Sequence, residues 1–437
     1  MPPLAFALGT SYTAASASAP VPAPGNLSYE SGHLTPEQVW RWLANNVPLL
    51  EPLWLARDGT HKLSRKPLRS RAPLTSGRIA PMQRQGDHRL RAMLPALAAA
   101  AACVRGASTD AAPEPPAPPA VGLKMQVAFS EYSPLSTSSE VMRRLLSPLT
   151  AAQVQRSLEH SGERLRGQSV DLAAERFVLY VPPRAPAEGY ALLTFVPPWD
   201  EARLPPGWAA VLDRYGVIFV SAARSGNDAD PIGRREPLAL LGAYNVMQRY
   251  PIDSARVYVG GFSGGSRIAL RLAIAYPDLF RGALLNAGSD PIDAGHANPP
   301  PRELLERFQE STRVVYVTGE HDTVRPMMDT ASIDSMRDWC VFDTASRITY
   351  GAGHEIVSPA ALSWALSALA EHARTDAAKL AACRAALEQR LSASLARVHE
   401  LIEAGKRHEA RKALEELDYR FGGLAAPQSL ALASALE

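Results

Sequence analysis

The sequence predicts an α/β fold in which a doubly wound, mostly parallel sheet is covered by helices on both faces. From about residue 121 onward, short apolar runs typical of buried strands alternate with segments of helical periodicity. One run, at residues 256–260, breaks at a glycine-rich turn and is followed at once by a helical pattern. This alternation favours parallel strands, because each connecting helix then covers one face of the sheet.

The expected elements follow one another in a regular order. We expect strands at residues 124–129, 176–181, 191–196, 216–221, 256–260, 282–285, 314–318 and 347–350. We expect helices at residues 237–249, 265–276, 301–309 and 359–372. A turn-forming segment joins residues 177–181 to residues 191–195, which predicts an antiparallel hairpin at the start of the sheet.

The composition divides the chain into three parts. Residues 1–120 are rich in alanine, serine, proline and basic residues, which predicts a disordered region; a nucleic-acid-binding arm is the alternative. Residues 121–372 form the predicted α/β domain. Residues 373–437 are polar and helical in pattern, which predicts a small helical tail.

The segment from Met82 to Cys103 has the pattern of a secretory signal. Basic residues are followed by a short apolar stretch and an alanine run, although a weak helix in a tail is the alternative. Cys103 is a candidate for lipid attachment, but the leucine usual in that motif is missing. The proline-rich residues 107–120 would then be a tether. We therefore expect an exported protein, periplasmic, envelope-anchored or extracellular, with a cytoplasmic location as the alternative.

Charge and composition argue against several kinds of partner. The net charge is +2 and 21% of the residues are charged, which gives no reason to expect a nucleic acid or a strongly acidic or basic partner. No apolar run is long enough to span a bilayer. The three cysteines, Cys103, Cys340 and Cys383, lack the spacing of a metal site, so we expect no metal.

The most informative motif is Gly-x-Ser-x-Gly at residues 261–265, between a predicted strand and a predicted helix. In that context the motif is typical of a nucleophile elbow, in which the serine lies on a sharp, strained turn. Gly261 and Gly265 lack the Cβ atoms that would clash as strand and helix approach each other. The helix N-terminus directs its partial positive charge towards the serine oxygen. These observations predict Ser263 as a nucleophile.

A serine hydroxyl needs a base within hydrogen-bond reach, and that base needs an acid to orient it. In the order serine, acid, histidine, the acid is Asp322, in the turn after the expected strand at residues 314–318. Glu320, Asp290 and Asp293 are competing acids. The alternative role for Asp322 is that of a turn or helix-capping residue.

The expected base is His354, in the small-residue loop that follows the last predicted strand. His321 and His296 are rivals, but both lie in earlier loops and break the order.

An oxyanion hole would complete the site. The backbone N–H of Gly264 is one expected donor. The second should come from the loop after residues 191–196, where Pro197 and Pro198 have no N–H, which leaves Trp199. A packing role is the alternative for Trp199.

These residues resemble the α/β-hydrolase superfamily, and most closely its branch of polyhydroxybutyrate depolymerases and feruloyl or acetylxylan esterases. Residues 250–258, 261–265 and 276–280 carry the resemblance, which covers roughly residues 175–372. It implies that Ser263, Asp322 and His354 act as nucleophile, acid and base. It also implies an exported carboxylesterase without a cofactor that acts on a small-molecule or polymeric ester. The family usually has His-Gly in the oxyanion loop, where this chain has Pro197-Pro198.

Cys340 and Cys383 match no cysteine pattern that we can assign to this family. A disulfide between them would tie the tail to the α/β domain and would require an oxidising compartment.

The sequence thus predicts a serine hydrolase that cleaves carboxylic esters through an acyl-enzyme intermediate. Two alternatives remain. A non-catalytic envelope binding protein with this fold would explain Pro197-Pro198 and the long appendages, and a serine peptidase would use the same three residues on amides.

Overall fold

The computed structural model describes residues 121–292, 297–371 and 375–437. The predictions for residues 1–120, including the signal-like segment and Cys103, lie outside the described residues, as do Asp293 and His296.

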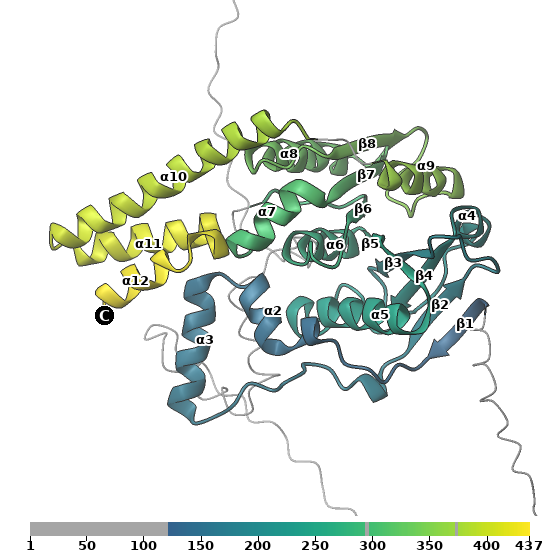
Figure 1. The fold of residues 1–437 in the computed structure, drawn as a ribbon, viewed down its shortest axis with the longest axis horizontal. Helices are drawn as coiled ribbons and strands as arrows, with labels where there is room; N and C mark the ends of the chain where they lie inside the picture. The colour runs from purple at the N-terminus through teal and green to yellow at the C-terminus, as the bar shows by residue number, and fades with distance from the viewer. Residues whose placement is uncertain (1–120, 293–296, 372–374) are drawn as a thin grey trace, which may run out of the picture. The chain divides into compact units, whose positions relative to one another are not determined.

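A single eight-stranded sheet forms the centre of the described chain, in the order β1-β2-β4-β3-β5-β6-β7-β8 (Figure 1). The strands are β1 (Gly122–Val127), β2 (Phe177–Val181), β3 (Tyr190–Val196), β4 (Val217–Ala222), β5 (Ile252–Phe262), β6 (Gly282–Asn286), β7 (Arg313–Gly319) and β8 (Thr344–Thr349). Strand β2 is antiparallel to both of its neighbours, and every later pairing is parallel. The predicted fold class, a mostly parallel α/β sheet, is confirmed.

The predicted hairpin between residues 177–181 and 191–195 is wrong. Strand β4 lies between β2 and β3, antiparallel to the first and parallel to the second. Two strands separated by a third are roughly 10 Å apart, a distance that the eight-residue connection spans easily. At the start of β3, the N–H of Tyr190 donates to the carbonyl of Pro251, 2.8 Å away, so β3 joins β5 instead of β2.

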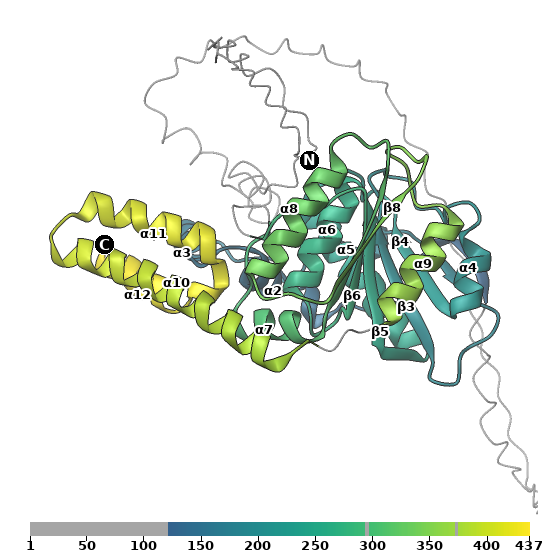
Figure 2. The same cartoon turned by 90° about the horizontal axis from the view of Figure 1, so that it is seen from above.

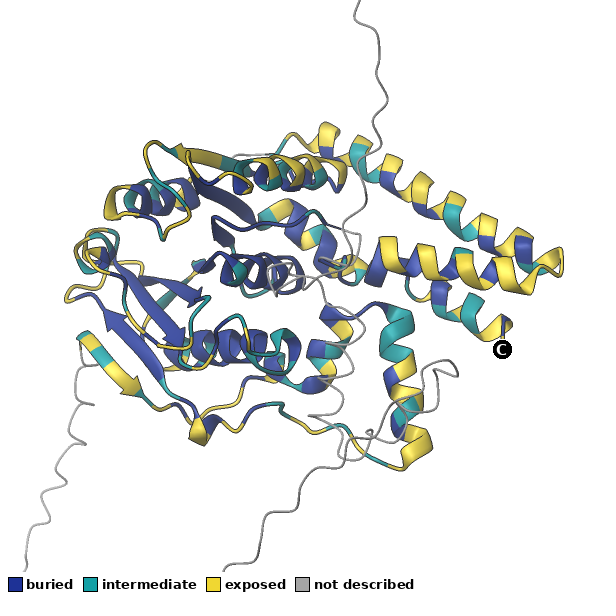
Figure 3. Ribbon diagram, turned by 180° about the vertical axis from the view of Figure 1, so that it is seen from behind, coloured by how far each residue is buried: buried dark blue, intermediate teal, exposed yellow. Residues whose placement is uncertain are grey.

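Helices cover both faces of the sheet (Figure 2). One face carries α5 (Glu236–Arg249), α6 (Gly264–Ala275) and α8 (Arg325–Asp338), and the other carries α4 (Trp208–Tyr215) and α9 (Pro359–Ala370). The remaining α-helices are α2 (Ser138–Leu145), α3 (Pro148–Ser161), α7 (Arg302–Ser311), α10 (Ala377–Glu403), α11 (Arg407–Phe421) and α12 (Gln428–Ala435). Two hydrophobic clusters, one on each face of the sheet, bury the strands of the centre (Figure 3). Such burial on both faces explains the nearly continuous apolar strands of the sequence.

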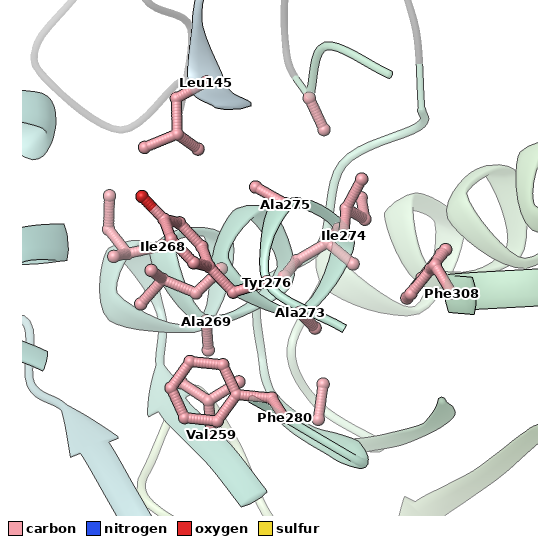
Figure 4. Close-up of a cluster of buried hydrophobic side chains, with 14 of the residues drawn as sticks. Leu145, Val259, Ile268, Ala269, Ala273, Ile274, Ala275, Tyr276, Phe280 and Phe308 are labelled. Carbon is pink, nitrogen blue, oxygen red and sulfur yellow. The ribbon is translucent and has the colours of Figure 1, made fainter. Parts of the chain in front are cut away.

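Helix α6, which follows the predicted elbow, is buried on all sides. Each residue from Gly265 to Ala275 is buried. Its apolar side chains, including Ile268 and Ile274, lie between Val259 of β5, Phe308 of α7 and Leu145 of α2 (Figure 4). A helix fixed in this way holds its N-terminus firmly against the end of β5, because a closely packed core resists displacement.

The C-terminal helices pack against the rest of the described chain. Asp418 of α11 accepts a hydrogen bond from the backbone N–H of Leu149, at the start of α3, at 3.0 Å. Arg384 of α10 donates to Gln309 of α7 at 2.6 Å. Cys383 of α10 forms a disulfide with Cys340, which follows α8. The predicted tail is therefore attached to the α/β core by side-chain contacts as well as by the chain itself.

Candidate active site

Ser263 lies between the end of β5 and the start of α6, with φ 54° and ψ −122°. This backbone conformation is unfavourable for a residue with a Cβ, and such outliers cluster at functional sites. The two flanking glycines explain how the turn closes. A Cβ on Gly261 would lie 2.3 Å from the carbonyl oxygen of Gly265, and a Cβ on Gly265 would lie 2.0 Å from the carbonyl oxygen of Val196. Neither position could hold a larger residue without a shift of the backbone.

The end of β6 holds the strained turn in place. The N–H of Ser263 donates to the carbonyl of Asn286 at 2.9 Å, and Ser266 Oγ donates to the carbonyl of Gly288 at 2.5 Å. Gly288 itself leaves no room, because a Cβ there would lie 2.2 Å from the carbonyl oxygen of Ser263. The geometry of Ser263 is thus fixed by two neighbouring strands and not by the turn alone.

The structure brings Ser263, His354 and Asp322 into one hydrogen-bonded chain. His354 Nε2 lies 2.9 Å from Ser263 Oγ, and His354 Nδ1 lies 2.6 Å from Asp322 Oδ2. Ser263 and Asp322 are buried, whereas 40% of the side chain of His354 is exposed. A carboxylate on Nδ1 fixes the tautomer in which Nε2 is free to accept a proton from the hydroxyl.

Loops at the carboxyl ends of β7 and β8 carry the acid and the histidine. The N–H of His321, next to Asp322, donates to the carbonyl of Ala352 at 2.8 Å. A Cβ on Gly319 would lie 2.3 Å from the carbonyl oxygen of Gly353, so the two loops are in close contact. The ring of Phe262 packs 5.1 Å from that of His354, centroid to centroid. Strands β7 and β8 thus fix the positions of the two loops that carry Asp322 and His354.

Asn286 is a site residue that the sequence analysis missed. Its carbonyl accepts from Ser263, while its side-chain Oδ1 accepts from the N–H of Val357 at 2.9 Å. Asn286 therefore links Ser263 to the loop that follows His354. The available signal was a polar residue at the end of an otherwise apolar parallel strand.

The competing candidates Glu320, Asp290 and His321 are not part of this hydrogen-bonded chain. Glu320 is exposed and accepts from the N–H of Gly351 at 3.0 Å, which stabilises the turn. Asp290 is buried and lies 3.4 Å from Arg267 in an ion pair. His321 is exposed. Of the candidates within the described residues, Asp322 and His354 are the pair in the chain that reaches Ser263.

The loop after β3 is in close contact with the turn at residues 261–265, because Pro197 lies beside Gly265. The carbonyl of Pro197 accepts from Arg235 Nη2 at 2.9 Å, and that of Pro198 accepts from the N–H of Asn227 at 3.0 Å. The Trp199 ring packs 6.1 Å from Phe262. Arg235 is buried, and burial lowers its pKa to about 10, so the side chain stays charged near neutral pH. The carbonyls of Pro197 and Pro198 in the loop after β3 are thus held by fixed donors.

A second buried carboxylate, that of Asp329, lies near the loop that carries Asp322. Asp329 of α8 accepts hydrogen bonds from Ser289 Oγ and Thr318 Oγ1, each at 2.5 Å. Burial raises the pKa of Asp329 to about 6, and the nearby charge of Asp322 acts in the same direction. Asp329 thereby joins α8 to the ends of β6 and β7.

Within the described parts of the chain, no group of three His, Cys, Asp or Glu residues is arranged to hold a metal ion. No helix among residues 121–292, 297–371 and 375–437 has the length and apolar character required to cross a membrane.

Comparison with known proteins gives limited matches. No protein-family profile matches the chain. A poly(3-hydroxybutyrate) depolymerase from Ralstonia pickettii is 30% identical over 98 residues, which cover 19% of this chain and 20% of that protein. The match thus spans one fifth of the relative's length.

Several solved structures are similar to part of this chain. An S-formylglutathione hydrolase from Staphylococcus aureus has 11% identity and a TM-score of 0.36 over 45% of this chain and 93% of its own. A ferulic acid esterase has 15% identity and a TM-score of 0.33 over 41% of this chain and 85% of its own. Likenesses at this level assign no function to this protein. By the topology of its sheet, and by where that sheet presents Ser263, Asp322 and His354, the chain is an α/β-hydrolase in fold.

Proposed function

We propose that this protein is a serine hydrolase that cleaves carboxylic esters through an acyl-enzyme intermediate. The observation that carries the proposal is the continuous hydrogen-bonded chain from Ser263 through His354 to Asp322, with distances of 2.9 and 2.6 Å. The strained backbone of Ser263 supports it, because an unfavourable conformation that two strands hold in place is typical of a reactive centre.

In the proposed reaction, Ser263 Oγ attacks the ester carbonyl while His354 Nε2 takes the hydroxyl proton. The carbonyl electron pair moves onto its oxygen, and the N–H of Gly264, with that of Trp199, would stabilise this charge. The intermediate collapses as the C–O bond to the alcohol breaks and His354 returns the proton to that oxygen. Water then repeats the sequence on the acyl-enzyme and releases the acid. Asp322 keeps the imidazole oriented and stabilises its charged form.

The substitution Ser263→Ala tests the nucleophile. We expect hydrolysis of p-nitrophenyl acetate to fall by about four or more orders of magnitude, with the fold intact by circular dichroism. Ser434→Ala, on an exposed face of α12, makes the same chemical change outside the site and should keep the parent rate.

Covalent labelling gives an independent test. A fluorophosphonate probe should add to the tryptic peptide that contains Ser263 in the parent protein and in Ser434→Ala, but not in Ser263→Ala. A folded parent protein that remains unlabelled would contradict the proposal and favour a non-catalytic binding protein. Faster cleavage of p-nitroanilides than of matched p-nitrophenyl esters would instead favour a serine peptidase.

The substrate is proposed from the resemblance to the Ralstonia pickettii depolymerase, whose name states that it acts on poly(3-hydroxybutyrate). We expect activity on esters of 3-hydroxy acids, and a series of acyl chain lengths together with this polymer and feruloyl esters measures the preference. If activity is highest on feruloyl esters, the specificity is instead that of the feruloyl esterases in the same branch.

We further propose that the protein is exported and that its signal lies at residues 82–103. The disulfide between Cys340 and Cys383 supports export, because disulfides persist mainly in oxidising compartments. Expression of the full chain, followed by fractionation and N-terminal sequencing, should give a processed protein outside the cytoplasm. Lipid labelling at Cys103 would identify an anchor, and an unprocessed cytoplasmic protein would contradict export.

A further inference from the structure

Asn227 lies in a segment that runs alongside the loop after β3. This segment follows β4, and several of its backbone N–H groups donate hydrogen bonds to the loop. The N–H of Asn227 donates to the carbonyl of Pro198 at 3.0 Å, and the N–H of Gly226 donates to Asp200 Oδ1 at 3.0 Å. The position of Asn227 is therefore set by the same loop that is expected to supply Trp199.

The side chain of Asn227 contacts the residue directly after Ser263. A Cβ on Gly264 would lie 2.3 Å from Asn227 Oδ1 and 3.1 Å from Nδ2. The amide thus occupies the space beside Gly264, between the two segments that carry the expected backbone donors. A side chain at position 264 would therefore require this amide to move.

One end of this amide is unsatisfied. Asn227 Oδ1 is buried and has no hydrogen-bond partner among the described residues. A buried polar atom that neither protein, water nor ligand satisfies costs about 1–3 kcal/mol. Rotation by half a turn about the Cβ–Cγ bond exchanges Oδ1 and Nδ2 and brings a donor to the same place. An acceptor that arrives with the substrate would then satisfy it.

The loop after β3 makes such a donor useful. Pro197 and Pro198 have no N–H groups, so this loop offers fewer backbone donors than one without prolines. We propose that the side-chain amide of Asn227 donates a hydrogen bond to the oxyanion, together with the N–H of Gly264. This inference rests on the proposed ester hydrolysis and assigns a further catalytic residue to it.

The role involves no transfer of a proton to or from Asn227. As Ser263 Oγ bonds to the carbonyl carbon, the C=O electron pair becomes a charge on oxygen, and the Asn227 N–H bond points at that charge. When the C–O bond to the leaving alcohol breaks, the electron pair returns and the hydrogen bond weakens. Because the charge exists mainly in the transition state, the amide should affect kcat far more than KM.

The substitution Asn227→Leu removes the donor with little change in volume. We expect kcat for p-nitrophenyl acetate to fall about 100-fold, with KM within about twofold of the parent value. Affinity for a trifluoromethyl ketone, which forms an oxyanion on Ser263, should fall by a similar factor. A residue that only packs would not lower the two quantities in parallel.

A matched control is Asn298→Leu, which removes an amide whose Nδ2 donates to the carbonyl of Leu145 at 3.1 Å. It should lower Tm while kcat stays near the parent value. If Asn227→Leu does not fold, Asn227→Asp retains the shape and loses the donor, and its kcat at pH 8 should fall at least as far.

The inference would be overturned if a folded Asn227 variant kept kcat and inhibitor affinity, or if KM alone changed. Failure of the proposed function is a different result. It would appear as a parent protein that the fluorophosphonate probe does not label, whatever residue stands at position 227.

Discussion

His354 meets its two partners through opposite ring nitrogens, and each partner comes from a different strand. Ser263 follows β5 and Asp322 follows β7, so the distances of 2.9 and 2.6 Å depend on the spacing of the whole sheet. Asn286 adds a direct link, since it contacts both Ser263 and the loop after His354. At this scale, the expected reactivity of one hydroxyl depends on a few hydrogen bonds to buried groups.

The substitution Asp322→Asn tests the orientation of the imidazole. An amide has nearly the same shape but donates where the carboxylate accepts, so it favours the tautomer with a proton on Nε2. We expect kcat for p-nitrophenyl acetate to fall by about 10⁴-fold while Tm changes little. Steady-state kinetics and thermal melts measure both quantities.

The same substitution in an exposed ion pair is the control. Asp334 pairs with Arg337 at 2.8 Å on the surface of α8, and Asp334→Asn should leave kcat unchanged. Equal activities of Asp322→Asn and Asp334→Asn would show that Asp322 does not orient the histidine.

Helix α8 is coupled to the acid loop through one buried carboxyl group. Asp329 connects α8 with Ser289 after β6 and Thr318 in β7, and Thr318 lies four residues before Asp322. Burial is the main reason that the pKa of Asp329 is raised from the ordinary value of 3.8 to about 6. Its native state therefore holds the proton more tightly than the unfolded state. The stability that this provides is fully present below about pH 4 and is lost as the pH rises through about 6.

The substitution Asp329→Asn should remove this dependence. A shift of about two pKa units corresponds to about 3 kcal/mol at most, so Asp329→Asn should gain up to that much stability relative to the parent between pH 4 and pH 8. Urea unfolding of both proteins at the two pH values measures the difference. A constant difference in unfolding free energy would contradict the assignment, and the exposed Asp334→Asn should show a constant one.

The sequence predicted the elements that have a strong local pattern. Strand β5 and helix α6 were predicted from an apolar β-branched run, a glycine-rich turn and helical spacing, and they lie close to the predicted positions. Helices α4 and α8 were not predicted, because short or weakly periodic helices give little signal in the sequence. The hairpin was wrong because neighbouring runs need not pair when a later strand fits between them.

The candidate site was likewise predictable only in part. The order of Ser263, Asp322 and His354 along the chain was enough to choose residues that the fold brings together. Asn286 and Asn227 were not assigned, because their positions follow from strand order and loop packing instead of local sequence. Polar residues next to strand ends mark where such groups lie, but tertiary structure decides which of them meet.

At the scale of the whole molecule, the C-terminal helices stabilise one side of the α/β core. Arg384 of α10 donates to Gln309 and to the carbonyl of Glu306 on α7, and Asp418 of α11 receives the N–H of Leu149 on α3. The outward faces of these helices are exposed (Figure 3). These contacts with α7 and α3 lie on the side of the sheet that carries α6. They therefore support α6 without touching Ser263 directly.

The disulfide between Cys340 and Cys383 is the covalent part of this attachment. It closes a segment with a sequence separation of 43 residues that includes β8, His354 and α9. Closing such a loop restricts the unfolded chain, which stabilises the native state by about 2–4 kcal/mol. We expect the double substitution Cys340→Ser with Cys383→Ser to lower the unfolding free energy by this amount, measured by urea denaturation.

Activity separates stability from catalysis in this double variant. Because hydrogen bonds to Asn286 and the acid loop position His354, kcat per folded molecule should stay near the parent value. The parent protein treated with a reductant should lose the same stability, and the variant should be insensitive to it. Two free thiols in the untreated parent, detected by mass spectrometry, would show that the bond does not form. The helices would then depend on their non-covalent contacts, which include those with α7, α3 and the end of α8.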